Sequence, residues 1–266
     1  MATKSYIWNP TDYEQNSSAQ QKFARDLIVK MGLQGNERVL DLGCGDGKVT
    51  AEIASFVSDG FVVGIDNSEA MINHARSRYP KNTFPNLEFR LANALQLPFN
   101  KEFTIVFSNS VLHWIQDHAS VLHGISQSLC SGGKIFLQMG GRGCAINMLR
   151  VVEDITLSSK WRKYFIDFSF PYSFYGPEEY KDWLKDAGLE AKRVELISKD
   201  MTHSGLAGLA GWIRTTWFPY TQSVPQEMRE QFITEIVETY VQDYPITEDG
   251  LTHLEMVRLE VEAEKL

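Results

Sequence analysis

The chain has 266 residues, of which 43% are hydrophobic and 23% charged, as expected of a globular protein that buries a substantial core. Its 26 Lys and Arg against 34 Asp and Glu give a net charge of −8, which argues against nucleic acid as a partner because such binding rests on neutralising phosphates. Three scattered cysteines, no apolar stretch of about 18 residues and no signal-peptide pattern favour a cytoplasmic protein without a membrane span, a disulfide framework or a metal.

The first 150 residues alternate short β-branched runs with helical patterns, which is typical of an α/β fold with a parallel sheet covered by helices. Predicted strands span residues 37–42, 61–66, 87–92, 103–108 and 133–139. Predicted helices span residues 47–57, 68–78 and 118–129, and Ser68 and Asp117 are suited to cap the last two.

The pattern changes after residue 140. Residues 145–166 are predicted to be helical, and a helix near 177–187 follows an aromatic segment, with Pro177 in its first turn and Gly188 at its end. The remaining predicted elements are a strand near 189–198, three helical pieces between 203 and 243, and a final strand near 252–262. A helical insertion between the last two strands would form a cap over one end of the sheet.

Residues 39–54, VLDLGCGDGKVTAEIA, place a glycine-rich loop between the first strand and the first helix. Parallel sheets bind ligands at the carboxyl ends of their strands, and glycines there let a ligand approach the backbone closely. The pattern is G-x-G-x-G, and Lys48 stands where a dinucleotide site has its third glycine. Asp41, two residues ahead of the loop, would repel a pyrophosphate but suits the cationic ammonium of S-adenosyl-L-methionine (SAM). An incidental glycine turn is the alternative.

Two further strand ends support nucleoside binding. Asp66 ends the second predicted strand, where an acid can accept hydrogen bonds from both ribose hydroxyls, as in NAD and SAM sites alike. Asn93 follows the third strand, where its amide can read the adenine amino group, although alone it would be an ordinary loop residue. The predicted cofactor-binding residues are Asp41, Gly43, Cys44, Gly45, Asp66, Asn67, Met71, Asn93, Ala94, Asn109 and His113.

The segments VLDLGCGDG, GIDNSEAMINHAR, LANALQLPF, SNSVLHWIQDH and GGKIFLQM together resemble the class I SAM-dependent methyltransferases. The resemblance to the trans-aconitate methyltransferase family is closer and extends over nearly the whole chain, through WNPTDY at 8–13, LHW at 112–114 and the region from GWIRTTW onward. Juvenile hormone acid methyltransferases resemble it more distantly. Asn93 departs from the family, in which many members carry Asp.

This resemblance implies a Rossmann-like, seven-stranded sheet with an antiparallel last strand and helices on both faces. It implies one domain over residues 1–266, with an N-terminal lid segment of about 1–34 and helical cap insertions of about 143–176 and 203–245. It also implies SAM as the cofactor, a small-molecule acceptor, and Tyr13 and Gln15 near the transferred methyl group, where an oxygen can hold it through weak C–H···O contacts.

Methyl transfer from a sulfonium is an in-line displacement, so the enzyme mainly aligns the acceptor and excludes water. A carboxylate acceptor is ionised at pH 7 and needs no general base, whereas a phenol, an amine or a carbon acid does. His113 is predicted to donate a hydrogen bond to an acceptor oxygen or to act as a base, and Trp114 to wall the acceptor site. Simple packing between strand and helix is the alternative for both.

A net-negative protein that binds an acid must supply local positive charge. Arg142 and Arg214 are the candidates, because arginine suits bidentate carboxylate recognition, with surface ion pairs as the alternative. His203 would add a donor or cap a helix, and Trp217 joins Trp114 in the predicted acceptor site. If the aromatic run 164–175 lines that site, an isoprenoid or fatty acid would fit better than a tricarboxylic acid.

We therefore predict a SAM-dependent methyltransferase of a small carboxylic acid. The alternatives are methylation of carbon, oxygen or nitrogen in another small metabolite, an NAD-dependent oxidoreductase, and a non-catalytic SAM-binding protein.

Overall fold

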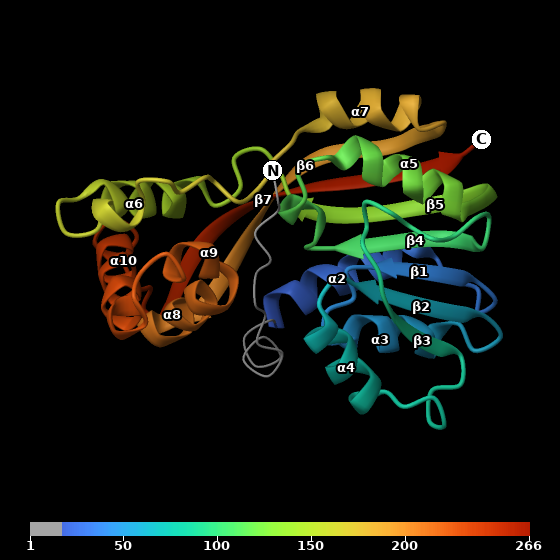
Figure 1. Ribbon diagram of the computed structural model, residues 1–266, viewed down its shortest axis with the longest axis horizontal. Coiled ribbons are helices and arrows are strands. Elements are labelled where there is room, and N and C mark those ends of the chain that lie inside the picture. Colours follow the sequence, from blue (N-terminus) through green and yellow to red (C-terminus); the bar gives the residue numbers. More distant parts are fainter. Residues whose placement is uncertain (1–17) are drawn as a thin grey trace.

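The computed structural model describes residues 18–266 and contains one seven-stranded sheet with the strand order β3-β2-β1-β4-β5-β7-β6 (Figure 1). Neighbouring strands pair in parallel from β3 to β5, and β7 runs antiparallel to both β5 and β6. The strands are β1 (Arg38–Leu42), β2 (Phe61–Asp66), β3 (Leu87–Leu91), β4 (Phe103–Asn109), β5 (Leu129–Gly140), β6 (Leu189–Ser204) and β7 (Leu251–Lys265).

Helices cover both faces of this sheet. One face carries α2 (Ser18–Met31), α3 (Lys48–Phe56) and α4 (Glu69–Arg78), and the other carries α5 (His118–Ser128) and α7 (Pro177–Asp186) (Figure 1). Alternate residues of each strand serve the two faces: in β1, Val39 packs toward α2 and α3, whereas Leu40 and Leu42 pack toward α5 and α7. The central strands are therefore nearly continuous apolar runs.

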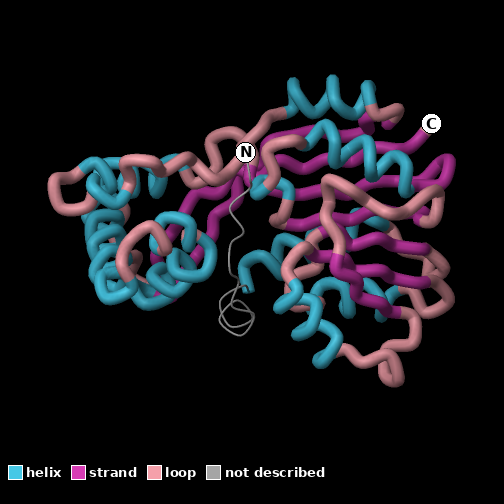
Figure 2. Tube along the Cα trace, viewed as in Figure 1, coloured by secondary structure: helices cyan, strands magenta, loops and turns pink. Residues whose placement is uncertain are grey.

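The remaining helices form a cap at one end of the sheet (Figure 2). They are α6 (Ile146–Leu157), α8 (Gly205–Thr216), α9 (Phe218–Thr221) and α10 (Arg229–Asp243), with short 3-10 turns at η2 (Arg162–Tyr164) and η3 (Gln226–Met228). The cap has its own apolar core, in which Trp161, Trp212 and Phe232 are buried. Its floor is the part of β6 and β7 that extends beyond β5.

The fold confirms the predicted α/β class and corrects several boundaries. The predicted helix over 145–166 is too long, because α6 ends at Leu157 and Ser158 is extended (φ −62°, ψ 156°) before η2 begins. The predicted strand 189–198 is too short, since Ser198–Ser204 continues to pair with Leu251–Val257. Residues 203 and 204, assigned to the cap, therefore belong to β6.

The sequence analysis identified no helix before the first strand, but residues 18–31 form α2. Ala24 and Leu27 on α2 are fully buried and join the core beneath the sheet. This part of the predicted lid segment therefore packs in the core, and the rest of that segment lies outside the described residues. No helix of the described part of the chain is long and apolar enough to cross a bilayer.

A buried carboxylate joins α2 to the far edge of the sheet. The Glu260 side chain on β7 is 0% exposed and forms ion pairs with Lys30 of α2 and with Arg193 and Lys199 of β6. Burial alone would raise its pKa, but the hydrogen bonds from Lys30 and Arg193 and the nearby charge of Lys199 lower the pKa to about 2.

We expect Glu260→Gln to lower the free energy of unfolding at pH 7 by about 2 kcal/mol, because three cations lose their shared counter-charge. A carboxyl whose pKa is depressed on folding stabilises the fold above its ordinary value of 4.5, and this stabilisation is lost as pH falls toward 2. The difference between the two proteins should therefore shrink below pH 4.5 in urea denaturation. Glu255→Gln, an exposed change on the same strand, should stay within about 0.5 kcal/mol of wild type at every pH.

Candidate functional site

The glycine-rich loop after β1 is fixed by close packing. Gly43 has φ +81°, and its N–H and that of Cys44 both donate to the Ile65 carbonyl, at 2.8 and 2.9 Å. A Cβ at Gly43 would lie 2.2 Å from Val111, in the turn after β4. Glycine is therefore required here because the backbone has positive φ and because a neighbouring turn leaves no room for a side chain.

Two carboxylates stand beside this loop. Asp41 is 2% exposed and accepts a hydrogen bond from Thr50 Oγ1 at 2.6 Å. Burial raises its pKa to about 7, partly offset by the Thr50 hydrogen bond and reinforced by the charge of Asp66. Asp66 accepts from the N–H of Gly45 at 3.0 Å and from that of Ser68 at 2.8 Å, and burial raises its pKa also. The Asn67 N–H also lies close enough to Asp66 to lower this pKa, so backbone N–H groups hold the carboxylate in place.

A pocket of about 40 Å³ opens at this loop. Five predicted cofactor-binding residues line it: Asp41, Gly43, Cys44, Gly45 and Asn109. The other lining residues were missed: Gln21, Asp46, Lys48, Val49 and Phe107. Asp46 and Lys48, which form an ion pair at 3.2 Å, lie within the glycine-rich stretch of the sequence, so their place in the pocket could have been predicted from that stretch. Gln21 comes from α2, whose place over the loop no local pattern indicates.

The LHW element forms the 3-10 turn η1 (Leu112–Trp114) directly after β4. His113 is 8% exposed, and its Nδ1 accepts a hydrogen bond from the Gly140 N–H at 3.4 Å. Burial, with smaller contributions from Arg258 and His118, holds the His113 pKa well below 6.5. The ring is therefore neutral at pH 7, with Nδ1 as acceptor and the proton on Nε2, which makes it a hydrogen-bond donor at Nε2.

Arg258 of β7, which the sequence analysis did not consider, lies beside η1. It is 3% exposed and pairs across the ladder with Gly140, whose N–H contacts His113. Its Nη2 donates to Ser110 Oγ at 2.7 Å, two residues before η1, and its guanidinium lies 5.4 Å from the centre of the Phe23 ring. An arginine among the buried apolar residues of the final predicted strand was the available signal.

Comparison with known proteins identifies the family. Residues 33–188, more than half of the chain, match the family described as "Methyltransferase domain". The chain belongs to the methyltransferase domain family.

Individual relatives agree with this assignment. The chain is 33% identical to an uncharacterized methyltransferase of Schizosaccharomyces pombe over 72% of this chain and 74% of that protein. It is 29% identical to a trans-aconitate 2-methyltransferase of Methylobacterium radiotolerans over 97% of this chain and 98% of that one. The solved structure of a Bacillus halodurans protein, 21% identical, superimposes with a TM-score of 0.63 and covers 92% of this chain and 99% of its own. The methyltransferase thus has the Rossmann-like class I fold that the sequence predicted.

The other predicted cofactor-binding residues of the methyltransferase do not line the loop pocket: Asp66, Asn67, Met71, Asn93, Ala94 and His113. Asn67 is exposed, Met71 is buried in α4 and Ala94 is half-buried. Asn93 is exposed, and its Oδ1 accepts from the Leu95 N–H at 2.9 Å, so the oxygen expected to meet adenine already closes a local turn. One lone pair of that oxygen is left.

The structure places the predicted acceptor-binding residues on separate elements. Arg142 is exposed and forms ion pairs with Glu178 and Glu179 at the start of α7, so its guanidinium serves the surface. Arg214 is exposed on α8. His203 does not cap α8, whose N-cap is Ser204; its ring lies 5.5 Å from that of Trp212, and burial lowers its pKa to about 4.

Trp114 connects the sheet to the cap. Its ring stacks on Phe218 of α9 at 5.2 Å and meets Tyr172 edge-on at 4.8 Å. Trp217, predicted as an acceptor contact, is 4% exposed and packs in the cap core against Trp212 and Tyr220.

Most side chains of the aromatic run 164–175 pack against other aromatic residues of the protein. Phe165 and Phe168 contact Tyr220 of the cap, at 6.3 and 4.5 Å between ring centres. Tyr172 and Phe174 both lie 6.1 Å from the His113 ring, and they are the members of the run beside the predicted acceptor site. Two rings of the run therefore lie beside His113, together with the Trp114 ring at 5.7 Å, whereas Tyr175 packs on His118 and Trp183 of α5 and α7.

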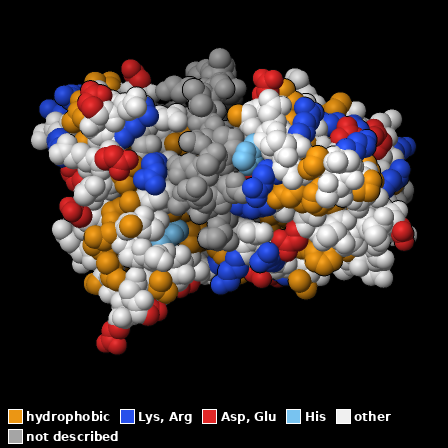
Figure 3. Space-filling model, turned by 90° about the horizontal axis from the view of Figure 1, so that it is seen from below, with side chains coloured by type: hydrophobic (Ala, Val, Ile, Leu, Met, Phe, Trp, Pro, Cys, Tyr) orange, Lys and Arg blue, Asp and Glu red, His pale blue; other side chains and the backbone are white. Residues whose placement is uncertain are grey.

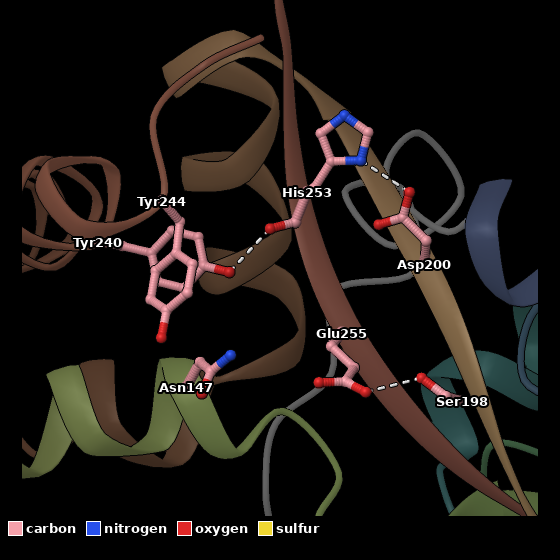
Figure 4. A pocket seen from close by; sticks show the side chains of 7 residues that line it. All are labelled: Asn147, Ser198, Asp200, Tyr240, Tyr244, His253 and Glu255. Atoms are coloured by element: carbon pink, nitrogen blue, oxygen red, sulfur yellow. Dashed lines mark hydrogen bonds and ion pairs between the residues drawn. The ribbon is translucent and has the colours of Figure 1, made fainter.

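A larger pocket, of about 270 Å³, lies elsewhere on the methyltransferase, between α6, α10 and the cap floor (Figure 4). Its lining residues are Asn147, Ser198, Asp200, Tyr240, Tyr244, His253 and Glu255. Asp200 pairs with His253 at 2.7 Å, and Glu255 accepts from Ser198 at 2.8 Å (Figure 4). No residue predicted for either ligand lines it.

Within residues 18–266, no group of three or more His, Cys, Asp and Glu residues is arranged to hold a metal ion, and Cys44, Cys130 and Cys144 are free thiols. Seen from below, Lys and Arg side chains are visible on both the cap half and the sheet half of the molecule (Figure 3). The predicted Tyr13 and Gln15 lie outside the described residues.

Proposed function

We propose that this methyltransferase transfers a methyl group from SAM to the carboxylate of a small organic acid. The residues at the loop fit such a donor. Asp41 and Asp66 offer carboxylates to a ligand that carries an ammonium, a sulfonium and a ribose diol, and Gly43 and Gly45 leave the backbone bare beside them. Asp41, next to the loop, would repel a pyrophosphate, which argues against a dinucleotide.

In this proposal Asp41 faces the ammonium, Asp66 accepts from the ribose hydroxyls, and Asn93 lies beside the adenine. SAM supplies an electrophilic methyl group that its positive sulfur already activates. The chain's own task is then to align the acceptor and to exclude water. The N-terminal segment, with Tyr13 and Gln15 near the methyl group, remains a predicted lid.

One observation carries the choice of acceptor: the buried guanidinium of Arg258 lies beside η1, next to a neutral His113. A guanidinium attracts an anion and suits a carboxylate in two-point contact. Because the His113 proton is on Nε2, that residue would donate a hydrogen bond to an acceptor oxygen and would not act as a base. An ionised carboxylate requires no base, so this arrangement suits it better than a phenol or an amine.

The near full-length similarity to a protein named trans-aconitate 2-methyltransferase supports the same class of acceptor. A radiolabelled methyl-transfer assay over a panel of mono-, di- and tricarboxylic acids, phenols and amines tests the proposal. We expect label in methyl esters, which alkaline hydrolysis releases as methanol. Label transferred only to phenols or amines would contradict it.

Donor binding should depend on pH through Asp41. Its pKa of about 7 means that the carboxyl is largely neutral below pH 7, whereas the donor's ammonium favours the ionised form. We therefore expect SAM affinity to rise with pH and level off above about pH 8, with a fall of up to about tenfold per pH unit below 7. Isothermal titration calorimetry between pH 5.5 and 8.5 measures this dependence. Asp41→Asn should bind more weakly and with a flatter profile; equal slopes in the two proteins would exclude Asp41 as the titrating group.

A further inference from the structure

A buried polar cluster stands behind the η1 turn. It consists of His118 at the start of α5, Ser173 in the segment before α7 and Tyr180 on α7, which are 1%, 8% and 0% exposed. Buried polar side chains are costly unless they are hydrogen-bonded, so the partners of these three groups show what the cluster does.

The cluster holds the backbone carbonyls of the LHW turn. His118 Nε2 lies 2.7 Å from the Leu112 carbonyl oxygen, and the Ser173 N–H donates to the His113 carbonyl at 2.8 Å. The Ser173 hydroxyl donates to the Ile115 carbonyl. The turn that carries His113 and Trp114 is thus bound from behind along its length.

The proton positions in the cluster follow from these contacts. A carbonyl oxygen only accepts, so His118 Nε2 must carry a proton that it donates to Leu112. Burial lowers the His118 pKa to about 4, so the ring is neutral at pH 7 and Nδ1 is bare. Nδ1 must then accept from the Tyr180 hydroxyl, 2.6 Å away. Tyr180 thereby selects the ring form that can hold the turn.

We propose that His118 is a positioning residue for methyl transfer: its Nε2–H fixes the Leu112 carbonyl and so sets where His113 and Trp114 stand. This inference rests on the proposed function, because that proposal places His113 and Trp114 at the acceptor. A displacement of about 1 Å in a group that aligns a reactant is enough to lower the rate by orders of magnitude.

Two substitutions of similar polarity separate positioning from packing. In His118→Gln the side-chain nitrogen lies as many bonds from Cα as Nε2 does, so it reaches the Leu112 carbonyl. In His118→Asn the nitrogen corresponds to Nδ1 and falls short. Hydrogen–deuterium exchange of the Trp114 and Ile115 amides, which close the turn onto Val111 and Leu112, reports the turn without turnover.

We expect these two amides to exchange at least about tenfold faster in His118→Asn than in wild type, and at nearly the wild-type rate in His118→Gln. With the acid that the panel identifies, kcat should fall about tenfold or more in His118→Asn and less than about threefold in His118→Gln, with unchanged SAM affinity. Equal exchange in the two variants would overturn the inference even if no acid were methylated, and faster exchange with an unchanged kcat would overturn it too.

A second variant covers the case in which His118→Asn fails to fold. Ser173→Ala loses the hydroxyl that holds the Ile115 carbonyl but keeps the backbone N–H that holds His113. It should accelerate exchange at the same amides and lower kcat in the same direction. If both the exchange rates and kcat of Ser173→Ala equalled the wild-type values, the inference that these hydrogen bonds fix the η1 turn would be contradicted.

Discussion

Replacing Asp66 by alanine is expected to raise the dissociation constant for SAM about 100-fold. The carboxylate is proposed to accept from both ribose hydroxyls, and two hydrogen bonds to a charged group together contribute roughly 3 kcal/mol, which corresponds to about two orders of magnitude in affinity. The Asp66 side chain also accepts a hydrogen bond from the Gly45 N–H, so we expect the substitution to loosen the glycine-rich loop as well. Isothermal titration calorimetry with S-adenosylhomocysteine measures the effect without turnover.

Asp59→Ala provides a matched control, because Asp59 is an exposed acid at the opposite end of the same strand, before Phe61. It removes one negative charge but should leave the affinity within about twofold. Thermal unfolding without ligand shows whether Asp66→Ala has lost stability as well. If a folded Asp66→Ala protein bound S-adenosylhomocysteine as tightly as wild type, the site would lie elsewhere.

Replacing Arg258 by methionine is expected to raise KM for the acceptor acid about 100-fold. Methionine keeps much of the apolar stem of the side chain but removes the guanidinium, so a carboxylate loses its charge-assisted hydrogen bonds, worth roughly 3 kcal/mol as a pair. SAM affinity should change less than about twofold, because Arg258 lies at Ser110 and Gly140 and does not line the glycine-loop pocket. Initial-rate kinetics at saturating SAM measure the change in KM.

The KM values of Arg142→Met and Arg214→Met should be compared with that of Arg258→Met, because the sequence analysis predicted that Arg142 and Arg214 bind the acceptor. Arg142 is bound by Glu178 and Glu179 on the surface, so its loss should leave KM unchanged. A rise in KM for Arg214→Met with no effect of Arg258→Met would transfer acceptor recognition to α8. Melting temperatures of all three variants exclude unfolding of the buried Arg258 position as the cause.

The sheet could be predicted because its signals are local. β1, β2 and β4 are short, mostly apolar runs bounded by turn residues and buried on both faces, and β3 alternates apolar and charged residues. The far half of β6 could not be predicted in the same way: its sequence, SKDMTHS, is polar, and it is a strand because Leu251–Val257 pairs with it from about 50 residues away along the chain. Strand pairing at that separation has no local signature.

The same distinction applies to the site. Asp41, Gly43 and Gly45 could be predicted because they lie within one strand–loop–helix unit, in which the acid and the glycines follow one another closely in the sequence. Arg258 meets Ser110 across 148 positions, and His118 meets Tyr180 across 62. Only the folded chain brings those pairs together, so composition and spacing pointed to Arg142 and Arg214 instead.

The two longest strands also have a mechanical consequence. β6 and β7 stay paired from Leu189 and Lys265 in the sheet to Ser204 and Leu251 beneath α8, with one register shift between Ala191 and Arg193, so the same two strands support both halves of the molecule. A continuous pair of strands can bend or twist along its length, but it provides no flexible hinge about which the two halves could rotate apart. We therefore expect reactants to enter and leave through small bending of these two strands or movement of the loops around them.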